Sequence, residues 1–88
     1  MQPNHYGALM DTFLAYFDQK DLDGQIAALT GCLALKPNNA DLFYFRGFAY
    51  FKQKKYGQAR MDFKGCVRAD PQHKVGHYWL GTFDLIAA

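Results

Sequence analysis

A 34-residue internal repeat is the sequence feature that most constrains how this chain can fold. When the sequence is shifted by 34 positions, residues 15–20 (AYFDQK) fall on residues 49–54 (AYFKQK), and five of the six positions are identical. The same shift places two glycines, two cysteines and two prolines on each other: Gly31 on Gly65, Cys32 on Cys66 and Pro37 on Pro71. A period of this length is typical of stacked helical hairpins, each of which buries its apolar surface against its neighbours.

Each unit reads as two helices. Asn38 and Asn39 precede an unbroken run and can cap its first turn, whereas Pro71 cannot continue a helix. The pattern predicts an all-α array of helix-turn-helix repeats with five helices. We expect a leader at 1–5, a divergent first repeat at 6–39, a second repeat at 40–73, and the first helix of a third repeat, or a capping helix, at 74–88. The predicted helices span 6–19, 22–36, 40–53, 56–69 and 72–87.

The two helices of the second unit differ in amphipathicity. Residues 56–69 place apolar side chains on one side, and the pattern assigns Asp62 to the opposite, polar side. Residues 42–51 are apolar nearly all round, and such a helix needs cover on more than one face. What covers the second face is the main functional question that the sequence raises.

Composition excludes several classes of function. The chain has 88 residues, enough for one domain, and its net charge of +2 is too small to indicate nucleic-acid binding. No apolar run is long enough for membrane insertion, and residues 1–11 do not read as a signal peptide, so we expect a cytoplasmic protein. The absence of serine and glutamate removes two common catalytic side chains. We therefore expect no enzymatic activity, no cofactor and no metal.

Cysteine and histidine spacing gives no stronger indication of chemistry. We interpret Cys32 and Cys66 as small buried residues, because stacked helices lie beyond disulfide reach. His73 and His77 stand four residues apart but have no third ligand at convincing spacing, so a capping or packing role is favoured over zinc. Asp21 lies in a turn, where aspartate bonds its own backbone.

Residues 40–73 resemble a tetratricopeptide repeat (TPR), whose signature is W-x2-L-G-x2-Y…A-x3-F…P. Phe43 and Arg46 stand at the tryptophan and leucine positions, and the remaining signature residues match: Gly47, Tyr50, Ala59, Phe63 and Pro71. The first copy departs from the pattern, because Phe13 and Gln25 replace the small glycine and alanine. With these larger side chains, how tightly the first helix packs on the second is left open.

The resemblance implies a right-handed solenoid of antiparallel helix-turn-helix repeats. Its concave groove would hold another protein. Its implied lining is nearly all apolar or aromatic: Met10, Leu14, Phe17, Tyr44, Phe48, Phe51, Tyr78, Thr82 and Leu85. Such a lining fits an apolar peptide or an amphipathic helix, as in an adaptor, co-chaperone or assembly scaffold, and argues against a carboxylate-tail ligand. The alternatives are that these side chains pack on one another, or that the chain forms a homo-oligomer.

The last helix leaves two questions open. We expect a following helix, or self-association, to cover Phe83 and Ile86, since solenoid ends normally carry a polar outer face. Trp79 is interpreted either as an interface anchor or as part of the core.

Overall fold

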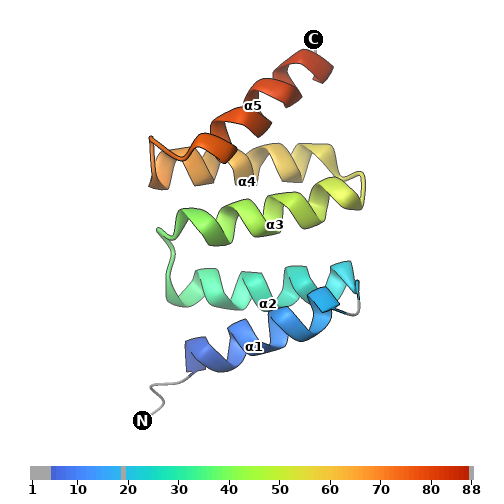
Figure 1. The fold of residues 1–88 in the computed structure, drawn as a ribbon, viewed down its shortest axis with the longest axis vertical. Coiled ribbons are helices and arrows are strands. Elements are labelled where there is room, and N and C mark those ends of the chain that lie inside the picture. Colours follow the sequence, from blue (N-terminus) through green and yellow to red (C-terminus); the bar gives the residue numbers. More distant parts are fainter. Residues whose placement is uncertain (1–4, 19, 88) are drawn as a thin grey trace.

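The chain is a stack of helices, confirming the all-α prediction. The computed structural model describes residues 5–18 and 20–87, with side-chain surroundings for residues 7, 10–17 and 20–83. Within that part the helices are α1 (His5–Asp18), α2 (Leu22–Leu35), α3 (Ala40–Lys52), α4 (Tyr56–Ala69) and α5 (Lys74–Ala87). Their ends lie within two residues of the predicted ones. The stack measures 47 × 27 × 16 Å, and its long axis runs from α1 to α5 (Figure 1).

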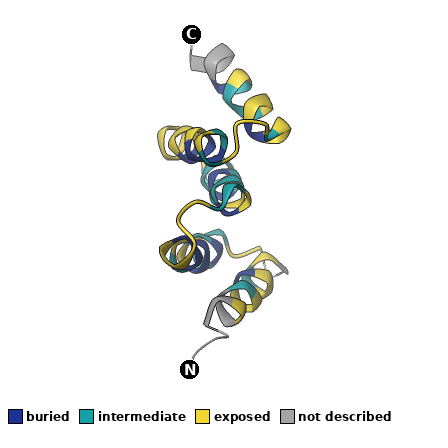
Figure 2. Ribbon diagram, turned by 90° about the vertical axis from the view of Figure 1, so that its left-hand side faces the viewer, coloured by how far each residue is buried: buried dark blue, intermediate teal, exposed yellow. Residues whose placement is uncertain are grey.

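The helices alternate between two sides of the stack. Each helix packs on the next one in the sequence. In side view, α1, α3 and α5 lie along one side, while α2 and α4 lie along the other (Figure 2). This alternation brings the first helices of successive units onto a common face.

Side-chain caps start three of the helices. Asp21 Oδ1 accepts a hydrogen bond from the Gly24 N–H at 3.0 Å, and Asn39 Oδ1 accepts one from the Leu42 N–H at 3.2 Å. His73 Nδ1 accepts from the Gly76 N–H at 3.0 Å, which confirms the capping role for this histidine. Each bond satisfies a backbone donor that the first helical turn leaves without a partner.

The turns within the two hairpins share one backbone conformation. Lys20 and Lys54 are equivalent under the 34-residue shift, and both are left-handed, with φ of 59° and 65°. The Asp21 N–H reaches the Tyr16 carbonyl at 2.9 Å, and the Lys55 N–H reaches the Tyr50 carbonyl at 3.0 Å, which is the Schellman pattern. A lysine stands in both turns where glycine is usual, at a cost of roughly 1 kcal/mol each.

The interior forms two hydrophobic clusters joined by α3. The first cluster contains Phe13, Ala28, Leu29, Cys32, Leu33 and Leu42. The second is mainly aromatic and contains Ala59, Phe63 and Phe83, with partly buried rings around them. Helix α3 contributes to both clusters, so the hairpins are neighbours in series.

The small residues of the second hairpin lie where its helices approach most closely. A Cβ on Gly47 would stand 3.0 Å from the Phe63 ring, and Ala59 is fully buried. In the first hairpin the close approach has moved to Gly24, where a Cβ would overlap the Tyr16 ring. Phe13 is nevertheless buried, so α1 packs through this ring.

Asp62 corrects the predicted helical face. The sequence pattern assigned it to the polar side of α4, but it is only 4% exposed. Asp62 Oδ1 and Oδ2 accept hydrogen bonds from Arg46 Nη2 at 2.7 Å and Nε at 2.8 Å. The prediction was wrong because the pattern of α4 alone shows Asp62 among polar neighbours. It contains no information about Arg46, the cation on the adjacent helix α3.

The structure also corrects the expectation that a further helix or a second copy covers Phe83. It was expected to need an additional cover, but it is 3% exposed and its ring lies 5.7 Å from that of Phe63. Trp79 stacks on Phe63 at 5.5 Å with an interplanar angle of 7°, so the tryptophan packs against the core. The Ile86 side chain lies outside the described residues.

Candidate protein-binding face

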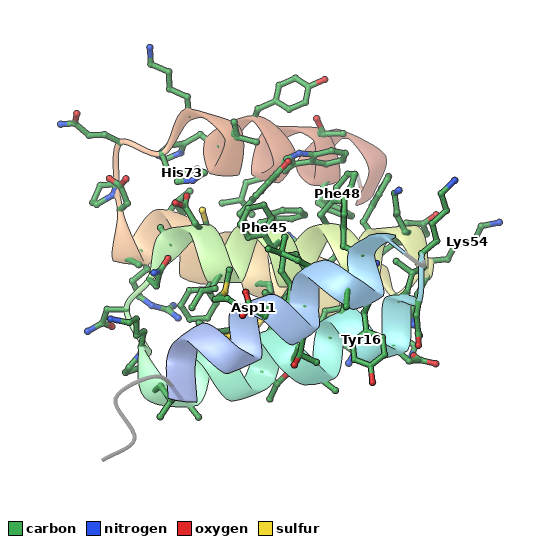
Figure 3. All side chains as sticks on the ribbon, turned by 60° about the horizontal axis from the view of Figure 1, so that its bottom comes forward. Asp11, Tyr16, Phe45, Phe48, Lys54 and His73 are labelled. Atoms are coloured by element: carbon green, nitrogen blue, oxygen red, sulfur yellow. The ribbon has the colours of Figure 1, made fainter. Side chains whose placement is uncertain are left out.

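A continuous line of aromatic contacts crosses the face formed by α1, α3 and α5. Successive ring centroids along it are 5.5 to 6.2 Å apart, a separation typical of aromatic pairs. We call this line the aromatic band. Its members in spatial order are Phe17, Phe13, Phe45, Tyr44, Phe48, Trp79 and Tyr78. Phe45 and Phe48 lie between α1 and α5 (Figure 3).

The aromatic band is most exposed at its two ends. Phe17 on α1 is 53% exposed and Tyr78 on α5 is 69% exposed. Leu14, one turn before Phe17, is 55% exposed, and Phe45 in the middle is 37% exposed. Large apolar side chains at this exposure, aligned on one face, are typical of a contact surface.

The predicted groove residues divide into two groups in the structure. Leu14, Phe17 and Tyr78 are exposed on the face. The others that can be placed are partly buried: Met10, Tyr44, Phe48, Phe51 and Thr82. Phe51 faces Trp79 and Phe83, with ring centroids at 4.8 and 5.7 Å. The Leu85 side chain lies outside the described residues.

A cavity of about 200 Å³ opens at one end of this face. It lies where the end of α1, the start of α2 and the end of α3 meet, and it is lined by Phe17, Lys20, Leu22, Gln25, Phe48 and Lys52. Two of the lining residues, Phe17 and Phe48, also belong to the aromatic band. The cavity is below the range of about 300–1,000 Å³ that is usual for small-molecule sites.

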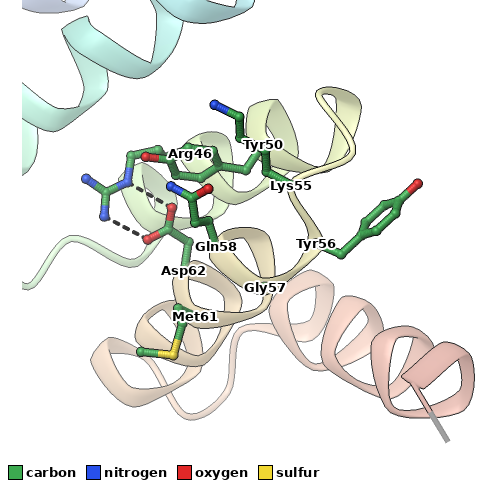
Figure 4. Close-up of a pocket in the computed structure, with 8 residues that line it drawn as sticks. All are labelled: Arg46, Tyr50, Lys55, Tyr56, Gly57, Gln58, Met61 and Asp62. Atoms are coloured by element: carbon green, nitrogen blue, oxygen red, sulfur yellow. Dashed lines mark hydrogen bonds and ion pairs between the residues drawn. The ribbon is translucent and has the colours of Figure 1, made fainter.

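A larger and more open cleft of about 530 Å³ lies along α3 and the start of α4 (Figure 4). Its charged wall is the Arg46–Asp62 pair, whose members already satisfy each other. Arg46 Nη1 also donates to Thr30 Oγ1 at 3.2 Å. The hydrogen bonds that Arg46 donates to Asp62 raise the pKa of Arg46, so the guanidinium stays charged. These bonds hold the helices together, and the cleft has no free charge at this wall.

The histidine before α5 and the two cysteines have structural roles. His73 Nε2 lies 3.0 Å from Asp41 Oδ1, which ties the start of α5 to α3. Both cysteines are buried free thiols, and burial raises their pKa values, to about 11 for Cys66. Among the described residues, no group of three histidine, cysteine or acidic side chains could hold a metal ion. The described helices include none that is long and apolar enough to cross a membrane.

Sequence reasoning missed three residues of this face. Phe45 follows a predicted groove residue directly, and only the nearly uniform apolar character of 42–51 pointed to it. The sequence assigned Lys20 no role and placed Lys52 at a solvated helix end, because nothing in a linear pattern brings residues 32 positions apart to one cavity. Their joint placement follows from the packing of α3 on α2.

Among the comparisons with known proteins, one family model matches part of the chain. The family model described as "Tetratricopeptide repeat" matches residues 40–73, which are the boundaries predicted for the second repeat. The search of curated proteins found no match. Tetratricopeptide repeats are typically protein-interaction modules without catalytic activity, so the match indicates a protein partner.

Proposed function

We propose, from the premise that this chain is a tetratricopeptide-repeat protein, that it binds an apolar segment of another protein on its aromatic band. The observation that carries the proposal is the exposure of Leu14, Phe17 and Tyr78 on the α1, α3 and α5 face. Burying these side chains against a partner would contribute roughly 25 cal/mol for each Å² of apolar surface removed from water. The band has few polar groups, so an amphipathic helix or an apolar stretch is the matching ligand.

The experiment is a selection on immobilised protein from a display library of random peptides of about 16 residues, which span about 24 Å as a helix. Selected peptides are then synthesised, and their affinity is measured by fluorescence anisotropy. The test variant is Leu14→Ser with Phe17→Ser. The matched control is Leu35→Ser with Met61→Ser, which removes side chains of comparable exposure from α2 and α4.

We expect the test variant to bind at least about tenfold more weakly, because it removes two large exposed apolar side chains, and burying such a side chain contributes roughly 1.5–3 kcal/mol. The control variant should bind as the original protein does. Equal losses in both variants, or a library that yields no binding peptide, would contradict the proposal. Light scattering on the same samples tests the alternative: a dimer that the test variant converts to a monomer would assign the band to self-association.

A further inference from the structure

The cavity at the α1–α2–α3 junction combines apolar walls with two ammonium groups. Phe17, Leu22 and Phe48 form its apolar walls, and the cavity volume of 200 Å³ corresponds to roughly seven water molecules. This space is small for a cofactor and suits one bulky side chain. Because Phe17 and Phe48 also belong to the aromatic band, a segment lying on the band would pass the mouth of the cavity.

Both lysines of the cavity are available to an incoming group. Lys20 and Lys52 are exposed, and neither forms an ion pair with a carboxylate in the described part of the chain. Lys52 Nζ lies 5.1 Å from the centre of the Phe48 ring, which places its charge over an apolar wall. The left-handed turn fixes the backbone of Lys20, so this side chain starts from a defined position.

Among the described side chains, the two acidic residues close in sequence to the cavity are already engaged. Asp21 caps α2, and Asp23 Oδ1 accepts a hydrogen bond from Gln53 Nε2 at 2.6 Å. Inside the cavity, Gln25 is 6% exposed, and its Nε2 donates to the Tyr16 carbonyl only at 3.5 Å, the long limit of such a bond. The site therefore offers positive charge and an amide with capacity for a further hydrogen bond.

We infer that this cavity receives a bulky apolar side chain of the bound segment, and that Lys20 and Lys52 pair with a carboxylate of the same segment within about one helical turn. This inference rests on the proposed function, because it names the chemistry of the segment that the aromatic band holds. A free anion would meet apolar walls here, whereas an acidic residue beside an apolar one satisfies both the walls and the charges.

The test repeats the peptide selection on two charge variants. The test variant is Lys20→Gln with Lys52→Gln. The control is Lys54→Gln with Lys64→Gln, which removes the same charge elsewhere, and Lys54 has the same left-handed backbone as Lys20. Peptides selected on the original protein should carry Asp or Glu within four residues of a large apolar residue, and those selected on the test variant should lose this preference.

Affinities of the synthesised acidic peptides give the quantitative result. We expect the test variant to bind them roughly three- to tenfold more weakly at about 0.05 M salt, since an exposed charge pair contributes little individually. The loss should shrink at about 0.5 M salt, because salt screens exposed charges. Analogues with Asn or Gln in place of the acidic residue should bind both charge variants equally. The control variant should behave as the original protein.

The outcomes separate the inference from the proposed function. Peptides that bind through Leu14 and Phe17 but show no acidic preference would overturn the inference and leave the proposed function intact. An equal loss for acidic peptides and their neutral analogues would also overturn the inference. Failure to select any peptide would remove both. Leu22→Phe provides a second check: by narrowing the cavity it should weaken every selected peptide, and unchanged binding would show that the cavity stays empty.

Discussion

The two junctions between successive hairpins are built from equivalent positions and packed in opposite ways. At the α1–α2–α3 junction a cavity remains, whereas at the α3–α4–α5 junction the rings of Phe51, Tyr56, Trp79 and Phe83 lie against one another. Phe83 is the residue 34 positions after Ala49. One repeat pattern therefore yields a filled junction or an open one, depending on side-chain size at a few positions.

We interpret the difference as a division between a junction that stabilises the stack and a junction that stays open for the proposed partner. At the second junction the aromatic side chains contact one another, and these contacts hold α5 in place. The first junction has the same left-handed turn, with a lysine after α1. Its cavity, however, leaves apolar side chains exposed beside the charges of Lys20 and Lys52. Function is thus expected where the repeat is least completely filled.

The largest effect on the difference between the junctions is expected from Phe83→Ala. This change gives the second junction the residue that the first has at the equivalent position, Ala49. We expect a loss of about 3–5 kcal/mol in the free energy of unfolding, because the ring is buried among other rings. Trp79 is the single tryptophan and stacks on Phe63, so its fluorescence during urea unfolding reports this junction.

The control is Tyr78→Ala on the same helix, which should change stability by no more than about 0.5 kcal/mol because Tyr78 is exposed. Equal midpoints for the two variants would contradict the filled junction.

The second prediction concerns the Arg46–Asp62 ion pair of the second hairpin, whose positions hold uncharged residues in the first hairpin. Arg46 and Asp62 correspond to Thr12 and Ala28 under the 34-residue shift. Arg46→Thr should destabilise the chain by about 2–4 kcal/mol, since it leaves a buried carboxylate without its cation. Asp62→Ala should cost less, because the Arg46 side chain is 21% exposed and can turn toward water.

The double variant makes this hairpin like the first one at both positions. Chemical denaturation should show it to be more stable than Arg46→Thr alone. A double variant that is less stable than either single variant would show that the pair acts through something other than its charges.

A third prediction uses the equivalent thiols Cys32 and Cys66. Burial raises the pKa of Cys66 from its ordinary 9.0 to about 11, so the folded chain keeps this thiol protonated after the unfolded chain has ionised. Stability should be fully present below about pH 9 and fall as the pH rises to about 11, by roughly 2 kcal/mol from this group.

Tyrosines and lysines titrate in the same range, so the measured quantity is the difference between variants. Urea unfolding from pH 8 to 11 should show a flatter pH dependence for Cys66→Ala than for the original protein. Cys32→Ala should also flatten it, because burial raises the pKa of Cys32 as well. Parallel curves for all three proteins would contradict the burial effect.

The smallest expected effect is the sharpest test of the functional difference. Lys20→Gly and Lys54→Gly should each stabilise the chain by up to about 1 kcal/mol, because glycine accepts a left-handed backbone. Lys20→Gly should also weaken acidic peptides, whereas Lys54→Gly should leave their affinity unchanged. Thermal melting and anisotropy on the same samples would check both effects, and equal binding by the two variants would remove the distinction between the turns.

Most of the fold could be predicted from the sequence, because a 34-residue period, caps and prolines act locally. The ends of all described helices, the caps at Asn39 and His73, and the close approach at Gly47 follow from such local rules. Asp62 and Phe83 could not be placed, since their surroundings come from a neighbouring helix that a single-helix pattern does not contain. The predicted groove assignments stay predictions, and for the same reason the sequence could not show that Lys20 and Lys52 line one cavity.

The arrangement of two clusters joined by α3 also determines how the chain would respond to force. Helices α1 and α5 lie at opposite ends of the long axis, and each packs mainly on its sequence neighbour (Figure 1). Tension applied between α1 and α5 would act on each helix–helix interface of the stack in turn, so every interface would carry the same force. The weakest interface would yield first and extend the chain while the rest of the stack remained folded.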